Sequence, residues 1–175
     1  MDRQVLRSGK FWMAAFAIVM FMLAVIGGIN SYSPIPHMDM WDGSLDFYLR
    51  LMRGENNLWF AQHNEHRILL SRFLFWVEYE IFEGLNYFLI AVNYILVLLA
   101  IFLFWRFSQL QHYQSIDQPT PKSPAPVLFF TLLMTAWLSH WMQWENLSWG
   151  FQSQFFLAQS IPLAAFYCLA ASSLN

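Results

Sequence analysis

Four stretches of the chain are apolar and contain no aspartate, glutamate, lysine or arginine: residues 11–29, 85–105, 126–142 and 151–171. About twenty such residues span a bilayer as a helix, because lipid cannot satisfy backbone polar groups and each must bond within its own segment. The sequence therefore predicts an all-α polytopic membrane protein with four transmembrane helices. Its composition agrees, since only 11% of the 175 residues are charged, well below the share in soluble domains.

The segment 67–83 differs from these runs because it carries five ionisable side chains, which would make a fifth span costly. Its apolar residues recur at helical spacing, which predicts an amphipathic helix lying in the membrane interface. A second interface helix is predicted over 40–53. Both helices belong to a long loop, 30–84, between the first two spans. The polar, proline-bearing segment 108–125 predicts another loop.

The charges favour one orientation of these spans. With the amino terminus inside, the inside segments 1–10 and 106–125 hold five of the nine basic residues, and the outside segments 30–85 and 143–150 hold nine of the eleven acidic ones. Basic residues concentrate on the cytoplasmic side, so we expect this orientation, with an uncleaved first span. A net charge of −2 leaves no basic surface for nucleic acid, and one cysteine permits no intrachain disulfide.

The first candidates for chemistry are Asp39 and Asp42, at the start of the interface helix predicted over 40–53. Two carboxylates at the membrane surface can supply a general base or bind a cation. The structural alternative is that Asp39 caps the helix and Asp42 adds charge to its first turn. In that alternative Asp46 and Arg50 form a surface pair.

A second cluster, His63, Glu65, His66 and Arg67, precedes the other interface helix, which contains Arg72. Two histidines and a glutamate within four residues can hold a metal, but no distant third ligand can be named. Interfacial hydrogen bonding by the histidines is the alternative. The two arginines are suited to a phosphate, which arginine binds with two hydrogen bonds.

The third cluster lies outside, between the third and fourth predicted spans. Glu145 stands at the membrane boundary beside Asn146, and Gln152 enters the fourth span. Polar groups at that depth are expected to face protein or a cavity rather than lipid. Structural packing of these groups remains the alternative.

These parts follow a definite order along residues 11–172. A span leads to an acidic motif (Asp-Met-Trp-Asp, 39–42) and a histidine turn (His-Asn-Glu-His, 63–66), each beginning an interface helix, and a polar outside turn (Gln-Trp-Glu-Asn, 143–146) follows the third span. This order resembles the amino-terminal module of the GT-C superfamily, the integral-membrane glycosyltransferases that use polyprenyl-phosphate-linked sugars. That family often has His-Pro-Pro at the turn and usually has eight or more spans.

The resemblance implies transfer of a sugar from a polyprenyl-phosphate donor to an acceptor on the outer face of a bacterial cytoplasmic membrane. Asp39 or Asp42 would be the catalytic base and Arg67 or Arg72 would stabilise the departing phosphate, while His66 and Glu145 would position the acceptor or the base. No cofactor is predicted, and a divalent metal remains an option. With four spans, we expect an amino-terminal module, a truncated or inactive relative, or a chain whose further helices come from a partner membrane protein.

A different class of function is also open, namely a non-catalytic membrane subunit or scaffold that binds a partner through its outside loop. A transporter is disfavoured because no predicted span carries an aspartate, glutamate, lysine or arginine that could serve in a proton relay. The enzyme and scaffold hypotheses differ in geometry. In an enzyme, Asp39, Asp42, His66 and Glu145 converge around one cavity, and in a scaffold they spread over the surface.

Overall fold

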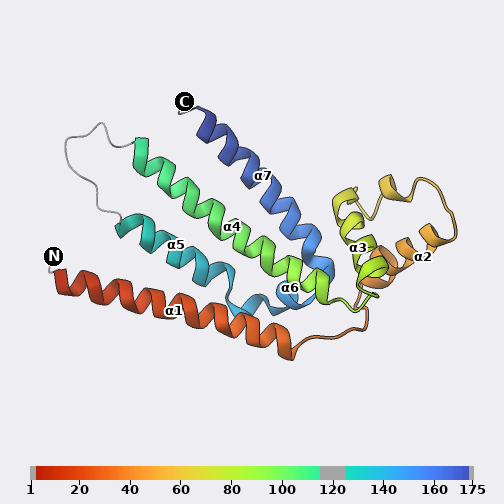
Figure 1. Ribbon diagram of the computed structural model, residues 1–175, viewed down its shortest axis with the longest axis horizontal. Coiled ribbons are helices and arrows are strands. Elements are labelled where there is room, and N and C mark those ends of the chain that lie inside the picture. Colours follow the sequence, from red (N-terminus) through yellow and green to blue (C-terminus); the bar gives the residue numbers. More distant parts are fainter. Residues whose placement is uncertain (1–2, 115–124, 174–175) are drawn as a thin grey trace. The chain divides into compact units, whose positions relative to one another are not determined.

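The computed structural model describes residues 3–114 and 125–173, and these residues form helices and loops with no β-strand (Figure 1). This confirms the all-α fold class. In chain order the elements, with η for short 3-10 or π-helical turns, are α1 (Arg3–Asn30), η1 (Trp41–Leu45), α2 (Asp46–Met52), η2 (Leu58–Phe60), α3 (Leu69–Ile81), α4 (Tyr87–Gln114), α5 (Ala125–Leu138), η3 (Trp141–Gln143), α6 (Trp144–Ser148), η4 (Gly150–Gln152) and α7 (Ser153–Ser172).

Three helical stretches are long and apolar enough to cross a membrane: Gly9–Asn30, Tyr87–Leu110 and Gly150–Ser172. They indicate an integral membrane protein, as the sequence predicted. The helix at the third predicted span, α5, ends at Leu138 and is therefore shorter than the predicted 126–142. There the side-chain amide of Gln143 donates a hydrogen bond to the carbonyl of Leu138, which satisfies a carbonyl that the next helical turn would otherwise bind.

Two further local predictions differ from the structure. The helix α4 continues to Gln114, so residues 108–114 are helical although they were expected to belong to a loop. The rest of that expected loop, 115–124, lies outside the described residues. A proline inside a helix often kinks or unwinds it, and such an unwinding could be expected at Pro162, yet α7 is one uninterrupted helix with this proline inside it.

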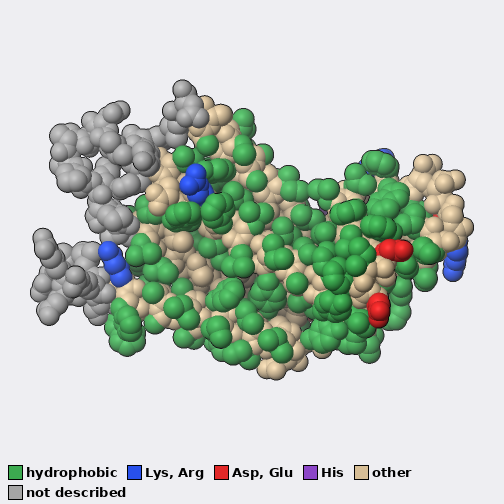
Figure 2. Space-filling view, viewed as in Figure 1, with side chains coloured by type: hydrophobic (Ala, Val, Ile, Leu, Met, Phe, Trp, Pro, Cys, Tyr) green, Lys and Arg blue, Asp and Glu red, His purple; other side chains and the backbone are tan. Residues whose placement is uncertain are grey.

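The chain divides into two compact units. Within the described residues, unit 1 contains 3–27, 97–114, 125–144 and 160–173, and unit 2 contains 28–96 and 145–159. All three candidate clusters belong to unit 2. In the face seen in Figure 2, hydrophobic side chains cover most of the described surface, and the visible acidic side chains lie in the part formed by α2 and α3.

Unit 2 has an aromatic core that joins elements far apart in the sequence. Phe75 of α3 stacks on Phe151 of η4, with ring centroids 5.4 Å apart and an interplanar angle of 12°. The buried members of this core are Met40, Phe47, Leu58, Phe75, Leu89 and Phe151. Burying one such side chain contributes about 1.5–3 kcal/mol, so this cluster holds the loop elements against the start of α4.

The start of α4 is capped by a buried carboxylate from α3. Glu78 is only 1% exposed, and it accepts hydrogen bonds from the backbone amides of Asn86 (2.7 Å) and Leu89 (3.0 Å). The first amides of a helix have no intrahelical acceptor, so Glu78 satisfies donors at this end of α4. The intervening turn requires left-handed backbone at Glu83 (φ 61°), Gly84 (φ 71°) and Asn86 (φ 69°).

We predict that Glu78→Ala lowers the free energy of unfolding by about 3 kcal/mol, because two buried amides lose their acceptor at about 1–3 kcal/mol each. Unfolding in mixed micelles, followed by tryptophan fluorescence, measures the change. Glu80→Ala is the matched control, since Glu80 lies on the same helix, is exposed, and accepts one hydrogen bond from Tyr48. Equal losses in the two variants would contradict the capping role.

The same carboxylate makes stability depend on pH. Desolvation by burial raises the pKa of Glu78, against its backbone hydrogen bonds, which lower it. The folded state therefore holds the proton of Glu78 more tightly than the unfolded state does, so the contribution of this group to stability is fully present below the ordinary carboxyl value of 4.5 and is lost as pH rises through the folded-state pKa. The glutamine of Glu78→Gln does not titrate, so this variant should lose the part of the pH dependence of stability that Glu78 causes.

Candidate functional site

Asp39 and Asp42 flank the start of a π-helical turn, η1. Single π-helical turns are rare and occur frequently at functional sites. The carbonyl of Asp39 accepts a hydrogen bond from the amide of Gly43 at 2.7 Å. Both carboxylates are exposed, and within the described part of the chain neither makes a hydrogen bond or an ion pair.

The structural alternative for this segment holds only in part. The prediction that Asp39 caps the helix is wrong, because the cap position falls on Met40 and no side chain bonds there. Met40 already has α-helical backbone (φ −65°, ψ −29°), whereas a capping residue has extended backbone. The predicted pair is confirmed, with 3.6 Å between Asp46 and Arg50. Asp42 lies in the first turn of η1, as the structural alternative predicted, so of the two carboxylates only that of Asp39 has no structural role in the described chain.

The histidine cluster forms a tight turn. His63 and His66 exchange backbone hydrogen bonds of 2.8 and 3.0 Å, which places Asn64 (φ 49°) and Glu65 at the tip. Glu65, His66 and Arg67 are exposed. His63 is half-buried, and its Nε2 has no hydrogen-bond partner among the described residues.

Aromatic contacts bring the acidic segment against the other two clusters. The ring of His37 lies 5.6 Å from that of Trp149, and the ring of His63 lies 5.5 Å from that of Phe151. At Gly43, a Cβ atom would lie 2.5 Å from the Phe151 ring and 3.0 Å from Cε1 of His63. The backbone segments that carry the three clusters thus meet in unit 2.

A buried asparagine on α4 holds the third cluster in place. Asn93 is fully buried, and its Nδ2 donates hydrogen bonds to the carbonyls of Asn146 (3.1 Å) and Trp149 (2.9 Å). The amide of Trp149 donates to the carbonyl of Glu145 at 2.9 Å. The side chains of Glu145 and Asn146 are exposed and that of Gln152 is half-buried, so this anchor presents Glu145 at the surface.

The two arginines expected at a phosphate differ in accessibility. Arg72 is buried, its Nη1 donates to the carbonyl of Leu58, and its guanidinium lies 5.3 Å from the centre of the Phe47 ring. Burial lowers the pKa of Arg72, and the charge of Arg50 lowers it further. Arg72 therefore supports the fold, and Arg67 is the exposed arginine of the two.

Sequence reasoning did not assign His37 and Asn93 to the site. His37 is linked to the site only by its packing on Trp149, a contact between distant residues that no local sequence pattern encodes. The sequence did contain a signal for Asn93, because Asn86 and Asn93 are two asparagines, seven residues apart, in an otherwise apolar span. Polar side chains in such a span usually bond to protein rather than face lipid.

Neither side-chain clusters that could hold a metal nor similarity to known proteins assigns a function to the described residues. Among the described residues, no three histidine, cysteine, aspartate or glutamate side chains cluster closely enough to hold a metal. Comparison of the chain with models of protein families, with curated proteins and with solved structures found no match. The function therefore has to be inferred from the residues of the site.

We predict that Gly43→Ala destabilises unit 2 by about 1–3 kcal/mol, as overpacking in a filled core does. The Phe151 ring cannot withdraw easily, because it stacks on both Phe75 and Trp149. Thermal unfolding followed by tryptophan fluorescence measures the loss. Gly9→Ala is the control, since a Cβ there meets nothing within 4 Å.

A double variant tests whether the contact with the Phe151 ring causes the loss of stability in Gly43→Ala. If Phe151 blocks the new methyl group, Gly43→Ala combined with Phe151→Leu should lose less stability than the sum of the two single changes. Strict additivity would show that Gly43 and Phe151 do not constrain one another.

Proposed function

We propose that this chain is a membrane-embedded glycosyltransferase, or the amino-terminal module of one, that moves a sugar from a polyprenyl-phosphate donor to an acceptor hydroxyl outside the membrane. One observation carries the proposal. The carboxylates of Asp39 and Asp42 are exposed and lack partners within the described chain, on a segment that packs against both other polar clusters. Acids that no cap or ion pair occupies are available to accept a proton.

In the proposed reaction, Asp39 or Asp42 removes the proton from the acceptor hydroxyl as its oxygen bonds to the anomeric carbon of the sugar. The bond between that carbon and the phosphate oxygen breaks, and the polyprenyl phosphate leaves with the electron pair. A positioned base of this kind contributes about 10²–10⁴-fold to the rate. Two candidate bases on one turn leave open which of them takes the proton.

The other exposed residues have supporting roles in this proposal. Arg67 binds the departing phosphate, because its guanidinium is accessible whereas that of Arg72 is buried. His66 and Glu145 orient the acceptor or the base. A lipid phosphate is a good enough leaving group to need no metal, and a divalent ion at Asp39 and Asp42 is the alternative.

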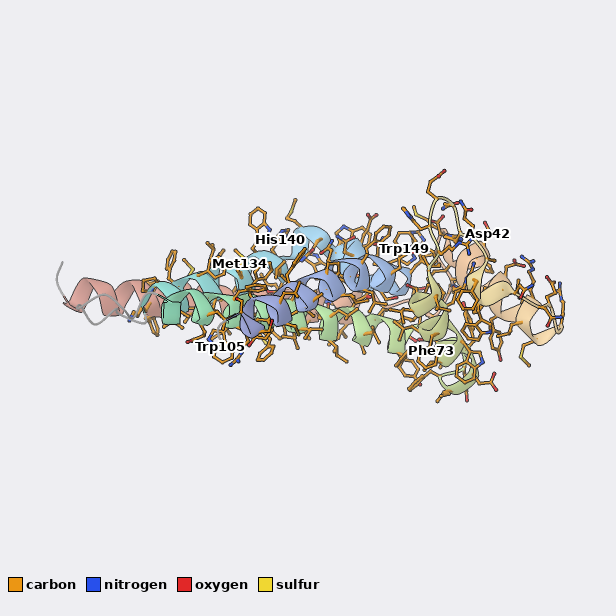
Figure 3. The ribbon with its side chains drawn as sticks, turned by 90° about the horizontal axis from the view of Figure 1, so that it is seen from above. Asp42, Phe73, Trp105, Met134, His140 and Trp149 are labelled. Atoms are coloured by element: carbon orange, nitrogen blue, oxygen red, sulfur yellow. The ribbon has the colours of Figure 1, made fainter. Side chains whose placement is uncertain are left out.

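The proposal includes a membrane arrangement. The 14 residues of α5 extend about 21 Å, so we propose that α5 crosses a hydrocarbon core of about 30 Å together with the residues that follow it. In this arrangement the amino terminus lies on the cytoplasmic side of a bacterial cytoplasmic membrane. We place α2 and α3 in the outer interface, where the exposed Leu70, Phe73 (Figure 3) and Ile81 of α3 contact lipid.

We predict that Asp39→Asn or Asp42→Asn lowers sugar transfer by about 10²–10⁴-fold, the contribution of a general base. The measurement is radiolabelled transfer in cell membranes that contain a polyprenyl-phosphate sugar pool, at matched protein levels. Asp46→Asn is the control, because Asp46 is a neighbouring acid already paired with Arg50, and it should keep near-normal transfer.

Two results would contradict this assignment. Equal transfer by wild type and both single variants, and by the double variant, would exclude these carboxylates as bases. No transfer by the stably inserted wild-type chain, even after addition of a partner protein that supplies further helices, would favour the non-catalytic subunit or scaffold.

A further inference from the structure

The length of α4 allows Arg106 to lie at the depth of lipid headgroups. It is the twentieth residue of a helix that begins at Tyr87, which separates the two residues by about 29 Å along the axis. That distance is close to the thickness of a bilayer hydrocarbon core, about 30 Å. If Tyr87 lies at one boundary of the membrane, Arg106 therefore lies at the other.

The side chain of Arg106 is held in a defined orientation by α7 within unit 1. Its Nε donates a hydrogen bond of 2.8 Å to the hydroxyl of Tyr167. The guanidinium carbon lies 5.6 Å from the centre of the Tyr167 ring and 5.9 Å from that of Trp105, distances at which a cation and an aromatic face attract. Phe107 packs edge-on against Tyr167, with centroids 5.6 Å apart, and fixes that ring in turn.

The charge of Arg106 has no counter-ion among the described residues. The described side chains of unit 1 contain no aspartate or glutamate, and their only other lysine or arginine is Lys10. With Nε bound to Tyr167, the two terminal nitrogens of the exposed guanidinium have no partner in the described chain. A guanidinium presents such a pair of N–H groups to a phosphate with two parallel hydrogen bonds.

We propose that Arg106 and Tyr167 form a binding site for the phosphate of an anionic membrane lipid. The arginine supplies two hydrogen bonds and the neutralising charge, and Tyr167 holds the guanidinium so that its free edge is available. Trp105 is partly exposed beside it and projects outward from α4 (Figure 3), in keeping with the preference of tryptophan for the headgroup region. This site is independent of the proposed glycosyl transfer.

The test is native mass spectrometry of the full chain in detergent, titrated with phosphatidylglycerol. Arg106→Gln should weaken binding at least about tenfold and Arg106→Lys should weaken it less, because lysine keeps the charge without the two parallel bonds. Tyr167→Phe should weaken it about threefold, since it keeps the ring and removes the hydrogen bond. Lys10→Gln, the control, should bind as wild type does.

Three comparisons make the proposal falsifiable. Unchanged phosphatidylglycerol binding by Arg106→Gln, with a normal unfolding temperature, would overturn it. Diacylglycerol, which lacks the phosphate, should not compete, and competition by it would show that chain contacts alone explain binding. Inorganic phosphate should compete only weakly, and equal competition would assign the site to a free ion rather than to a lipid.

Discussion

The hydrogen bonds from the amides of Asn86 and Leu89 to the buried carboxylate of Glu78 connect α3 to the beginning of α4. A membrane span cannot begin with unsatisfied amides buried in an apolar surrounding, so these two hydrogen bonds constrain both helices. The same helix end carries Leu89 in the aromatic core and Asn93 beneath the third polar cluster. Loss of the cap would therefore loosen the support of the whole candidate site.

Charged side chains in unit 2 divide into those that the fold uses and those that it leaves free. Glu78 and Arg72 are buried and bonded to backbone, which gives each a structural role. Asp39 and Asp42 are exposed without such bonds in the described chain. Burying a charge is costly unless it is paired or hydrogen-bonded, so the two groups are subject to different constraints, and the proposed chemistry uses the exposed acids.

Periodicity predicted most of the helices, because apolar runs and amphipathic stripes are local features of the sequence. It predicted an interface helix over 67–83, close to the observed α3. In that prediction Glu78 counted only as a charge that makes a membrane span unfavourable. It could not foresee that Glu78 caps α4, which depends on a left-handed turn and on packing between two helices. Side-chain contacts such as His37 on Trp149 likewise depend on tertiary structure. Local signals therefore found the clusters but not what joins them.

The contact between the segment that carries Asp39 and Asp42 and the segment that carries Glu145 and Asn146 is the central claim about the site, and cross-linking tests it most directly. In a Cys168→Ser background, His37→Cys and Trp149→Cys replace two rings whose centroids are 5.6 Å apart. A short bifunctional thiol reagent should join the two positions within one chain, as linked peptides in mass spectrometry, while single-cysteine variants give none. Modification of both cysteines without any linked peptide would contradict the account.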